Sequence, residues 1–469
     1  MQQTPGERPA TIRLTIDSIL IACSLVAWTL PAAFGMRLNW GLRTSVLVPV
    51  AVILLSRLLL HRERFTAAVR GRGRVLSATF GAIWVIAFLR TALRRLTIDT
   101  LYIIGYLAFL TTLLALLWLA YRRYRDDPGG LLLLRFAAMM VAGSYVLANV
   151  VAFALGVRQP DLIYLATYPT QMLSWLGVNS NRTLFPFADG INAFGIISGM
   201  TLAAFATAAA LGVPRGLRWL AGTVVVCSLI AMIMTDSRGA LVYSAVAFLI
   251  GFAPRATRGT LRWLPLAASF VPIALILTWP QALSRLSVGA RPGGVMSEVQ
   301  RSALELELCA ESTVTASGAL SNRPIVWETA IDALRPPKLL HLVGYGFRGQ
   351  EIAGVSEKLS CVFLSYVHKR LVSTHNIWLQ AVFDVGYIGA AVMVGLAIFL
   401  VRRLSPQKSA RREPVSAGML SAIQYILLAG ALEATLSPDF GATFVLFVVI
   451  ATTVIAANVD GAPTPGPRE

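Results

Sequence analysis

Apolar runs recur along almost the whole chain, and they restrict the fold more than any other feature. Crossing the hydrocarbon core of a bilayer takes about 20 mainly apolar residues. About twelve runs qualify, near 14–35, 42–60, 75–93, 100–120, 131–155, 191–212, 218–235, 238–253, 262–279, 376–401, 416–434 and 440–457. With 56% hydrophobic and 14% charged residues, the chain lacks the polar surface of a soluble domain. The sequence therefore predicts an all-α integral membrane protein.

One long hydrophilic stretch separates the ninth run from the tenth. We therefore predict transmembrane helices 1–9 in residues 1–279, a large external loop domain in 280–375 and helices 10–12 in 376–460. The Pro/Gly-rich residues 461–469 are expected to be a disordered tail. Inside the loop, Ser297–Leu308 has the composition of a surface helix, and a second helix is expected over Pro324–Leu334.

The net charge of +18 does not indicate a nucleic-acid partner, because the basic residues collect in alternate loops. This is the positive-inside pattern, which predicts both termini in the cytoplasm and the 280–375 loop outside. The basic loops contain Arg62, Arg64, Arg70, Arg72 and Arg74; Arg122, Arg123 and Arg125; Arg255, Arg258 and Arg262; and Arg402, Arg403, Lys408, Arg411 and Arg412.

The four cysteines divide into two pairs. Cys23 and Cys227 lie in apolar runs, where packing is the expected role. Cys309 and Cys361 lie in the external loop, where an oxidising compartment permits a disulfide between them. Two buried thiols are the alternative.

Three polar residues stand at the predicted outer membrane surface: Arg238 between two apolar runs, Arg323 at a helix start, and His375 at the start of the tenth run. Guanidinium groups bind phosphate oxygens bidentately, so two arginines suit a diphosphate. A histidine can take a proton from a hydroxyl near neutral pH. This set suits the displacement of a diphosphate leaving group.

Each of these residues also has an ordinary structural interpretation. Arg238 could cap a helix or anchor it at the interface, and Arg323 could pair with Glu328 or Glu307. His375 could be a hydrogen-bonded interfacial residue. The spacing of the three in the sequence does not show that they converge.

Two other patterns do not indicate cofactor sites. Gly344–Gly349 matches G-x-G-x-x-G, but no βαβ unit surrounds it, so a turn is expected rather than a nucleotide site. His341, His368 and His375 share the loop without metal-type spacing. We therefore expect no metal, no cofactor and no direct nucleotide substrate.

Four segments together resemble the O-antigen ligase/polymerase superfamily of bacterial membrane glycosyltransferases. They are 235–240 (TDSRGA), 322–330 (NRPIVWETA), 344–347 (GYGF) and 374–379 (THNIWL), followed by Gly386 and Gly389. A looser match is 187–193 (FADGINA), with Asn192 at a recurring asparagine. No single motif is specific, but their order, the twelve runs and the loop position agree over most of the chain.

The resemblance implies a GT-C-like fold and metal-independent, inverting transfer of a glycan from undecaprenyl diphosphate, at the periplasmic face of the bacterial inner membrane. Arg238 and Arg323 would bind the donor diphosphate, with Asn376 beside them, and His375 would be the general base. As an O-antigen ligase, the enzyme would use a sugar hydroxyl of lipid A-core as acceptor. O-antigen polymerases and protein O-oligosaccharyltransferases share this core and differ in the acceptor.

A transporter of lipid-linked anions is the alternative from a different class, because it too would need arginines near the membrane surface. Transporters place ionisable residues at mid-span and carry paired helix breaks in their two halves. Here mid-span acids are scarce, and Glu433 lies near the end of its run. The sequence therefore favours an enzyme.

Overall fold

The computed structural model describes slightly more than half of the chain. The described residues are 52–56, 58–60, 74–93, 98–124, 128–158, 170–174, 177–178, 180–188, 190–213, 215–252, 267, 323–358, 373–404, 414–433, 435–436, 447 and 450–451. The predicted Cys309–Cys361 disulfide, the Ser297–Leu308 helix and the 461–469 tail lie outside these residues.

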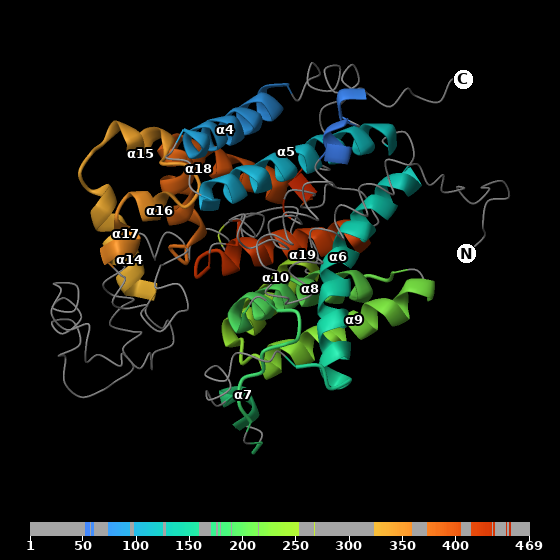
Figure 1. Ribbon diagram of the computed structural model, residues 1–469. Coiled ribbons are helices and arrows are strands. Elements are labelled where there is room, and N and C mark those ends of the chain that lie inside the picture. Colours follow the sequence, from blue (N-terminus) through green and yellow to red (C-terminus); the bar gives the residue numbers. More distant parts are fainter. Residues whose placement is uncertain are drawn as a thin grey trace, which may run out of the picture.

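The described residues are mainly helical (Figure 1). The longer helices are α4 (Arg74–Ala92), α5 (Ile98–Tyr124), α6 (Pro128–Ala154), α8 (Ile191–Ala210), α9 (Arg215–Met234), α10 (Arg238–Phe252), α14 (Arg323–Leu334), α18 (Ile377–Leu404) and α19 (Pro414–Ala429). The short ones are α7 (Gln171–Ser174), α15 (Leu339–Val343), α16 (Gly349–Ile352) and α17 (Val355–Lys358). No β-strand occurs among the described residues, so the all-α class is supported.

Three described helices are long and apolar enough to cross a membrane: Ile191–Ala210, Leu217–Met234 and Ile377–Arg402. They coincide with the runs predicted at 191–212, 218–235 and 376–401. Shorter apolar helices such as α10 and α19 also match predicted runs. Run 14–35 lies wholly outside the described residues, so the count of twelve spans and the position of the large loop stay predictions.

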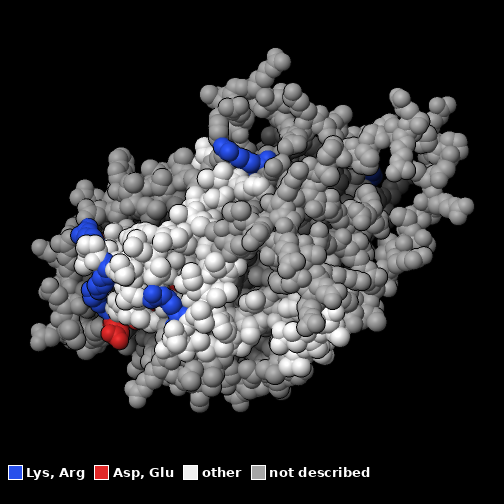
Figure 2. Space-filling model, turned by 90° about the horizontal axis from the view of Figure 1, so that it is seen from above, with Lys and Arg blue, Asp and Glu red and all other residues white. Residues whose placement is uncertain are grey.

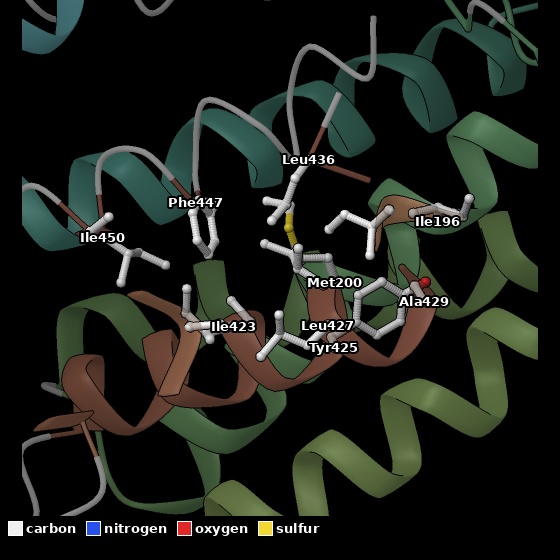
Figure 3. Close-up of a cluster of buried hydrophobic side chains, with 14 of the residues drawn as sticks. Ile196, Met200, Ile423, Tyr425, Leu427, Ala429, Leu436, Phe447 and Ile450 are labelled. Atoms are coloured by element: carbon white, nitrogen blue, oxygen red, sulfur yellow. The ribbon is translucent and has the colours of Figure 1, made fainter. Parts of the chain in front are cut away.

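Helix α8 is the centre of the bundle and packs against α9, α10 and α19. The apolar part of α8 is 78% buried, whereas the apolar part of α9 is 33% buried. Figure 3 shows Ile196 and Met200 of α8 beside Ile423, Tyr425 and Leu427 of α19 in the buried apolar core. At Gly199, a Cβ atom would lie 2.5 Å from the Tyr425 hydroxyl, so glycine permits this close approach.

Large apolar side chains also cover the outside of the bundle. On α9 and α10, Trp219, Val226, Val242 and Leu249 are all more than half exposed. The described surface seen from above in Figure 2 is mostly uncharged, with only a few basic and acidic side chains. In water such a surface would favour aggregation, whereas hydrocarbon solvates it. This outer surface fits a membrane protein.

The segment 323–358 carries α14 to α17 and packs against the first part of α18 (Figure 1). Tyr345 N–H donates to the Phe383 carbonyl (2.7 Å) and Gly346 N–H to the Asp384 carbonyl (2.9 Å). These carbonyls are available because Gly386, with φ of 74°, interrupts the helical geometry of α18. The segment is therefore built onto the start of a membrane-spanning helix.

Two local predictions in this segment are confirmed. Helix α14 runs from Arg323 to Leu334, with Pro324 in its first turn, where its missing N–H costs nothing. The G-x-G-x-x-G pattern forms the turn between α15 and α16. Gly344 has φ of 82°, and a Cβ atom there would lie 2.5 Å from the Asp384 carbonyl oxygen. Its glycine is therefore required by backbone geometry and packing.

Candidate functional site

A buried carboxylate joins two basic side chains that are far apart in the sequence. Arg323 donates through Nη2 to Oε1 of Glu433, and Nδ1 of His375 lies 2.7 Å from Oε2 of the same carboxylate. The side chain of Glu433 is 6% exposed, that of Arg323 18% and that of His375 31%. We call these three residues the Glu433 group. Its basic members are thus partly exposed, whereas the acid is buried.

The Glu433 group is assembled where α18 begins and α19 has just ended. Ile377 N–H donates to the Gly430 carbonyl (2.8 Å), and the Asn376 amide donates to the Ala431 carbonyl (3.1 Å). The Asn376 side-chain oxygen also accepts from Trp378 N–H and Leu379 N–H, which caps the start of α18. These bonds fix His375 opposite Glu433.

The backbone of His375 is held in an unfavourable conformation. Its φ of 49° lies in the left-handed region, which costs a residue with a Cβ atom about 1–2 kcal/mol. Next to it, the Thr374 hydroxyl donates to the Asn376 carbonyl (3.0 Å), and Thr374 N–H donates to Oε1 of Gln380 (3.0 Å). Such strain persists only where surrounding contacts enforce it, and it is common at functional sites.

Charge in the Glu433 group follows from its burial and its partners. Glu433 is buried, and its two carboxylate oxygens are hydrogen-bonded to Arg323 and His375, which favours the ionised form of the carboxylate. Glu433 lies beyond the end of α19 and is ionised. An ionised carboxylate accepts a hydrogen bond from Nδ1–H of His375, which leaves Nε2 as the proton acceptor.

Arg323 has bonding capacity beyond its ion pair. Its Nε–H is buried and has no hydrogen-bond partner among the described residues, although the neighbouring Nη2 is paired. The alternative that Arg323 pairs with Glu328 is wrong, because its partner is Glu433. The other suggested partner, Glu307, lies outside the described residues. A planar guanidinium of this kind can still offer donors to an anionic ligand.

A second buried carboxylate stands in the turn between α9 and α10. Arg182 Nη2 lies 3.1 Å from Oδ2 of Asp236, and Arg238 Nε lies 3.9 Å from the same oxygen. Met172 N–H donates to Oδ1 (3.1 Å). The Asp236 side chain is 1% exposed, whereas those of Arg182 and Arg238 are 28% and 42% exposed. We call Arg182, Asp236 and Arg238 the Asp236 group.

The two groups lie at the same end of the bundle. Tyr243, on the helix that Arg238 begins, is close enough to Arg323 and Glu433 to interact with them electrostatically. At Gly195, in the first turns of α8, a Cβ atom would lie 1.8 Å from Oγ of Ser237. The starts of α8, α10 and α18 therefore face the same side as the end of α19. Arg238, Arg323 and His375, which the sequence singled out, lie at this end.

The remaining predicted residues have different surroundings. Asn376 is fully buried and its side chain caps α18, so its contact with a donor diphosphate stays a prediction. Asn192 is exposed in the first turn of α8. Nε2 of His341 pairs with the Tyr345 hydroxyl (2.9 Å). Asn322 and His368 lie outside the described residues. Within the described part of the chain, no three metal-ligating side chains gather into a site.

Sequence reasoning missed Glu433 and Arg182 as members of the site. An acid at the end of an apolar run is a signal for Glu433, because an ionisable residue there is expensive unless it is paired. Arg182 lies in an irregular segment beside two asparagines and carries no comparable signal. Only the fold brings it to Asp236.

Comparison with known proteins adds one finding. The family model described as O-Antigen ligase matches residues 223–394. The match runs from α9 into α18 and includes Arg238, Arg323 and His375, but it leaves out Arg182 and Glu433. No curated protein matches the sequence.

Proposed function

We propose that this member of the O-antigen ligase-type superfamily of membrane glycosyltransferases is an O-antigen ligase. The reaction is inverting transfer of a glycan from undecaprenyl diphosphate to a sugar hydroxyl of lipid A-core. It takes place at the periplasmic face of the bacterial inner membrane and uses no metal. The family match supports a glycosyltransferase of the ligase or polymerase type. The donor, the acceptor and the side of the membrane are part of the proposal.

The observation that carries the proposal is the pairing of Nδ1 of His375 with the buried carboxylate of Glu433. This contact orients the imidazole and selects the tautomer whose Nε2 accepts protons. It also stabilises the imidazolium that forms when Nε2 takes a proton. A histidine held in this way is suited to act as a general base.

In the proposed reaction, the acceptor hydroxyl gives its proton to Nε2 of His375 while its oxygen attacks the anomeric carbon of the donor. The bond between that carbon and the diphosphate oxygen breaks, and its electron pair stays on the diphosphate. Attack from the face opposite the leaving group inverts the anomeric configuration. The diphosphate is a good leaving group, so no acid is needed to protonate it.

The arginines would stabilise the charge that develops on the diphosphate. Arg238 is more exposed than Arg182 and Arg323, and Arg323 has a buried Nε–H with no partner among the residues that the structure describes. Fixed cations near developing negative charge lower the barrier most in a site that excludes water. Asn376 would contribute less to diphosphate binding, because its side chain already caps α18.

An enzyme of this kind needs a site that opens toward lipid, because both substrates are lipid-anchored. The exposed apolar side chains of α9 and α10 fit contact with hydrocarbon, and Arg238 begins α10. Donor and acceptor would therefore reach the site by diffusion within the outer leaflet.

Purified protein in liposomes, supplied with lipid-linked glycan, tests the proposal. One set receives lipid A-core, a second receives only further lipid-linked glycan, and a third receives a pilin-type protein. We expect glycan on lipid A-core, and a rate about 10²–10⁴-fold lower after His375→Ala. Products only in the second or third set would instead identify a polymerase or a protein O-oligosaccharyltransferase. Movement of donor across the bilayer with no transfer would indicate a transporter.

A further inference from the structure

A chain of buried polar groups connects α16 to the residue before His375. Gln380 on α18 accepts at Oε1 from Thr374 N–H (3.0 Å). Its Nε2 donates to Oε1 of Gln350 (2.7 Å) and to Oδ1 of Asp384 (2.8 Å). Asp384 Oδ1 also accepts from Gly349 N–H (3.0 Å). We call Gln350, Gln380 and Asp384 the polar clasp.

The three side chains of the polar clasp lie inside the packed protein. Gln350 is 0% exposed, Gln380 4% and Asp384 6%. Two of them belong to α18, which is otherwise apolar enough to span a membrane. Burying such groups is unfavourable unless their hydrogen bonds are made, so the clasp forms only when α16 is docked on α18.

Gln380 is the member nearest to the proposed base. It accepts from Thr374 N–H, one residue before His375, whose φ of 49° needs support from its surroundings. The other side of the imidazole is held by Glu433. The orientation of His375 therefore depends on the contact of its ring with Glu433 and on contacts of the neighbouring backbone, among them that of Thr374 with Gln380.

We propose that Gln380 is a positioning residue for His375, and that the polar clasp makes the alignment of this base depend on docking of the 344–352 turn and α16 onto α18. This inference rests on the proposed function, because it assumes that His375 is the base. It adds a route by which a segment outside the spanning helices controls the chemical step. A bound acceptor that displaces α16 would change the rate without touching His375.

Two substitutions and their combination test the route. Gln380→Met and Gln350→Met remove the clasp's amides with little change in volume. Misalignment of a reacting group by about 1 Å costs up to roughly 100-fold, so we expect kcat to fall about 10- to 100-fold in Gln380→Met. The KM for donor should stay within about twofold, because neither residue is placed at the diphosphate.

The double variant separates a connected route from two separate defects. Gln350 reaches Thr374 only through Gln380 in these contacts, so the double variant should be no slower than Gln380→Met alone. Independent defects would multiply. Multiplying losses of kcat would overturn the proposed route.

Asp384 provides the conservative rescue. Asp384→Asn keeps Oδ1 as the acceptor for Gln380 and Gly349 N–H, whereas Asp384→Leu removes it. We expect the asparagine variant to retain most of the wild-type kcat and the leucine variant to lose about as much as Gln380→Met. Because the leucine variant also tests folding, each variant is first compared with wild type by thermal unfolding in detergent.

The outcomes distinguish this inference from the proposed function. An active His375→Ala variant would remove the base itself, and the positioning role with it. An inactive His375→Ala beside Gln380→Met and Gln350→Met variants of wild-type kcat would overturn the positioning role alone. Losses confined to KM, or equal losses in Asp384→Asn and Asp384→Leu, would also overturn it.

Discussion

The Glu433 group and the Asp236 group use the same arrangement for different ends. In each, a buried carboxylate holds two basic side chains that approach it from separate segments. Around Asp236 both partners are arginines, so with an ionised carboxylate the group carries one net positive charge. Around Glu433 one partner is a histidine, so the group is neutral until His375 takes a proton and then carries one positive charge.

This difference suits the two groups to different roles in the proposed reaction. A permanent positive charge suits binding of the donor diphosphate, because it does not change as the reaction proceeds. A group that becomes positive when it takes a proton suits the chemical step, because its charge rises as the diphosphate departs. In both groups a buried carboxylate holds the basic side chains in place. This pairing costs less free energy than leaving any one of these charges unpaired.

The largest expected effect comes from removing the base. His375→Ala should lower kcat for glycan transfer about 10²–10⁴-fold, the usual contribution of a general base. Donor affinity should stay close to wild type, because the cations remain. Rates with purified protein and donor binding by quenching of a labelled lipid-linked glycan measure both. Unchanged product formation would remove His375 from the chemical step.

Glu433→Gln should have the next largest effect. It keeps the size of the side chain but removes the charge that supports the imidazolium, so kcat should fall roughly 10–10³-fold. Arg323 would also lose its buried partner, which typically costs about 3–5 kcal/mol. The thermal unfolding temperature should therefore fall in Glu433→Gln and recover partly in Glu433→Gln/Arg323→Gln. An unchanged rate would mean that the pairing does not serve catalysis.

Substitution of the proposed diphosphate ligands should weaken binding more than it slows the chemical step. Arg238→Ala and Arg323→Ala each remove a charged hydrogen-bond donor worth about 1.5–3 kcal/mol, which corresponds to roughly 10- to 100-fold in donor affinity. Arg335→Ala is the matched control, because Arg335 follows the last residue of α14, is 70% exposed and pairs with Asp332. Wild-type affinity in both test variants would exclude the phosphate role.

Arg182 should have a smaller effect that depends on charge alone. Arg182→Ala lowers the fixed charge of the Asp236 group, while Arg182→Lys preserves it. We expect a several-fold loss of donor affinity in the alanine variant at low ionic strength and little loss in the lysine variant, with the difference shrinking as salt screens the charge. Equal losses in both variants would instead mean that Arg182 acts by shaping the 180–188 segment.

The smallest expected effect is that of a chelator. Incubation with EDTA should leave the transfer rate unchanged, since the proposed reaction relies on arginines where other glycosyltransferases use a metal ion. Addition of Mg²⁺ afterwards controls for effects on the lipids. Strong inhibition that Mg²⁺ reverses would show that the Asp236 and Glu433 groups are not sufficient for the donor diphosphate.

Residues with strong local signals could be predicted from the sequence. The boundaries of α8, α9 and α18 follow from apolar length, and the start of α14 follows from the proline in its first turn. Arg238 and His375 were identified because polar residues at the edges of apolar runs are conspicuous, and Arg323 because it stands at a predicted helix start. The carboxylates Asp236 and Glu433 were not assigned a role, because an acid reveals its partner only when the chain is folded.

The internal geometry of α18 could not be predicted either. The apolar run indicates one continuous helix, and nothing in its composition shows that Gly386 would adopt a positive φ. That conformation depends on the close approach of Leu342, whose carbonyl oxygen would lie 2.3 Å from a Cβ atom at position 386. Contacts of this kind join segments distant in sequence, and the spacing of apolar residues does not reveal them.

The break at Gly386 divides α18 into two mechanically distinct pieces. Changes in bilayer thickness are absorbed mainly by the tilt of spanning helices. We expect the piece after Gly386 to follow such tilting more readily than Ile377–Val385, which is hydrogen-bonded at one end to the residues after α19 and at the other to the turn that follows α15. The later part of α18 can therefore tilt with the membrane while the first part keeps His375 in a fixed orientation.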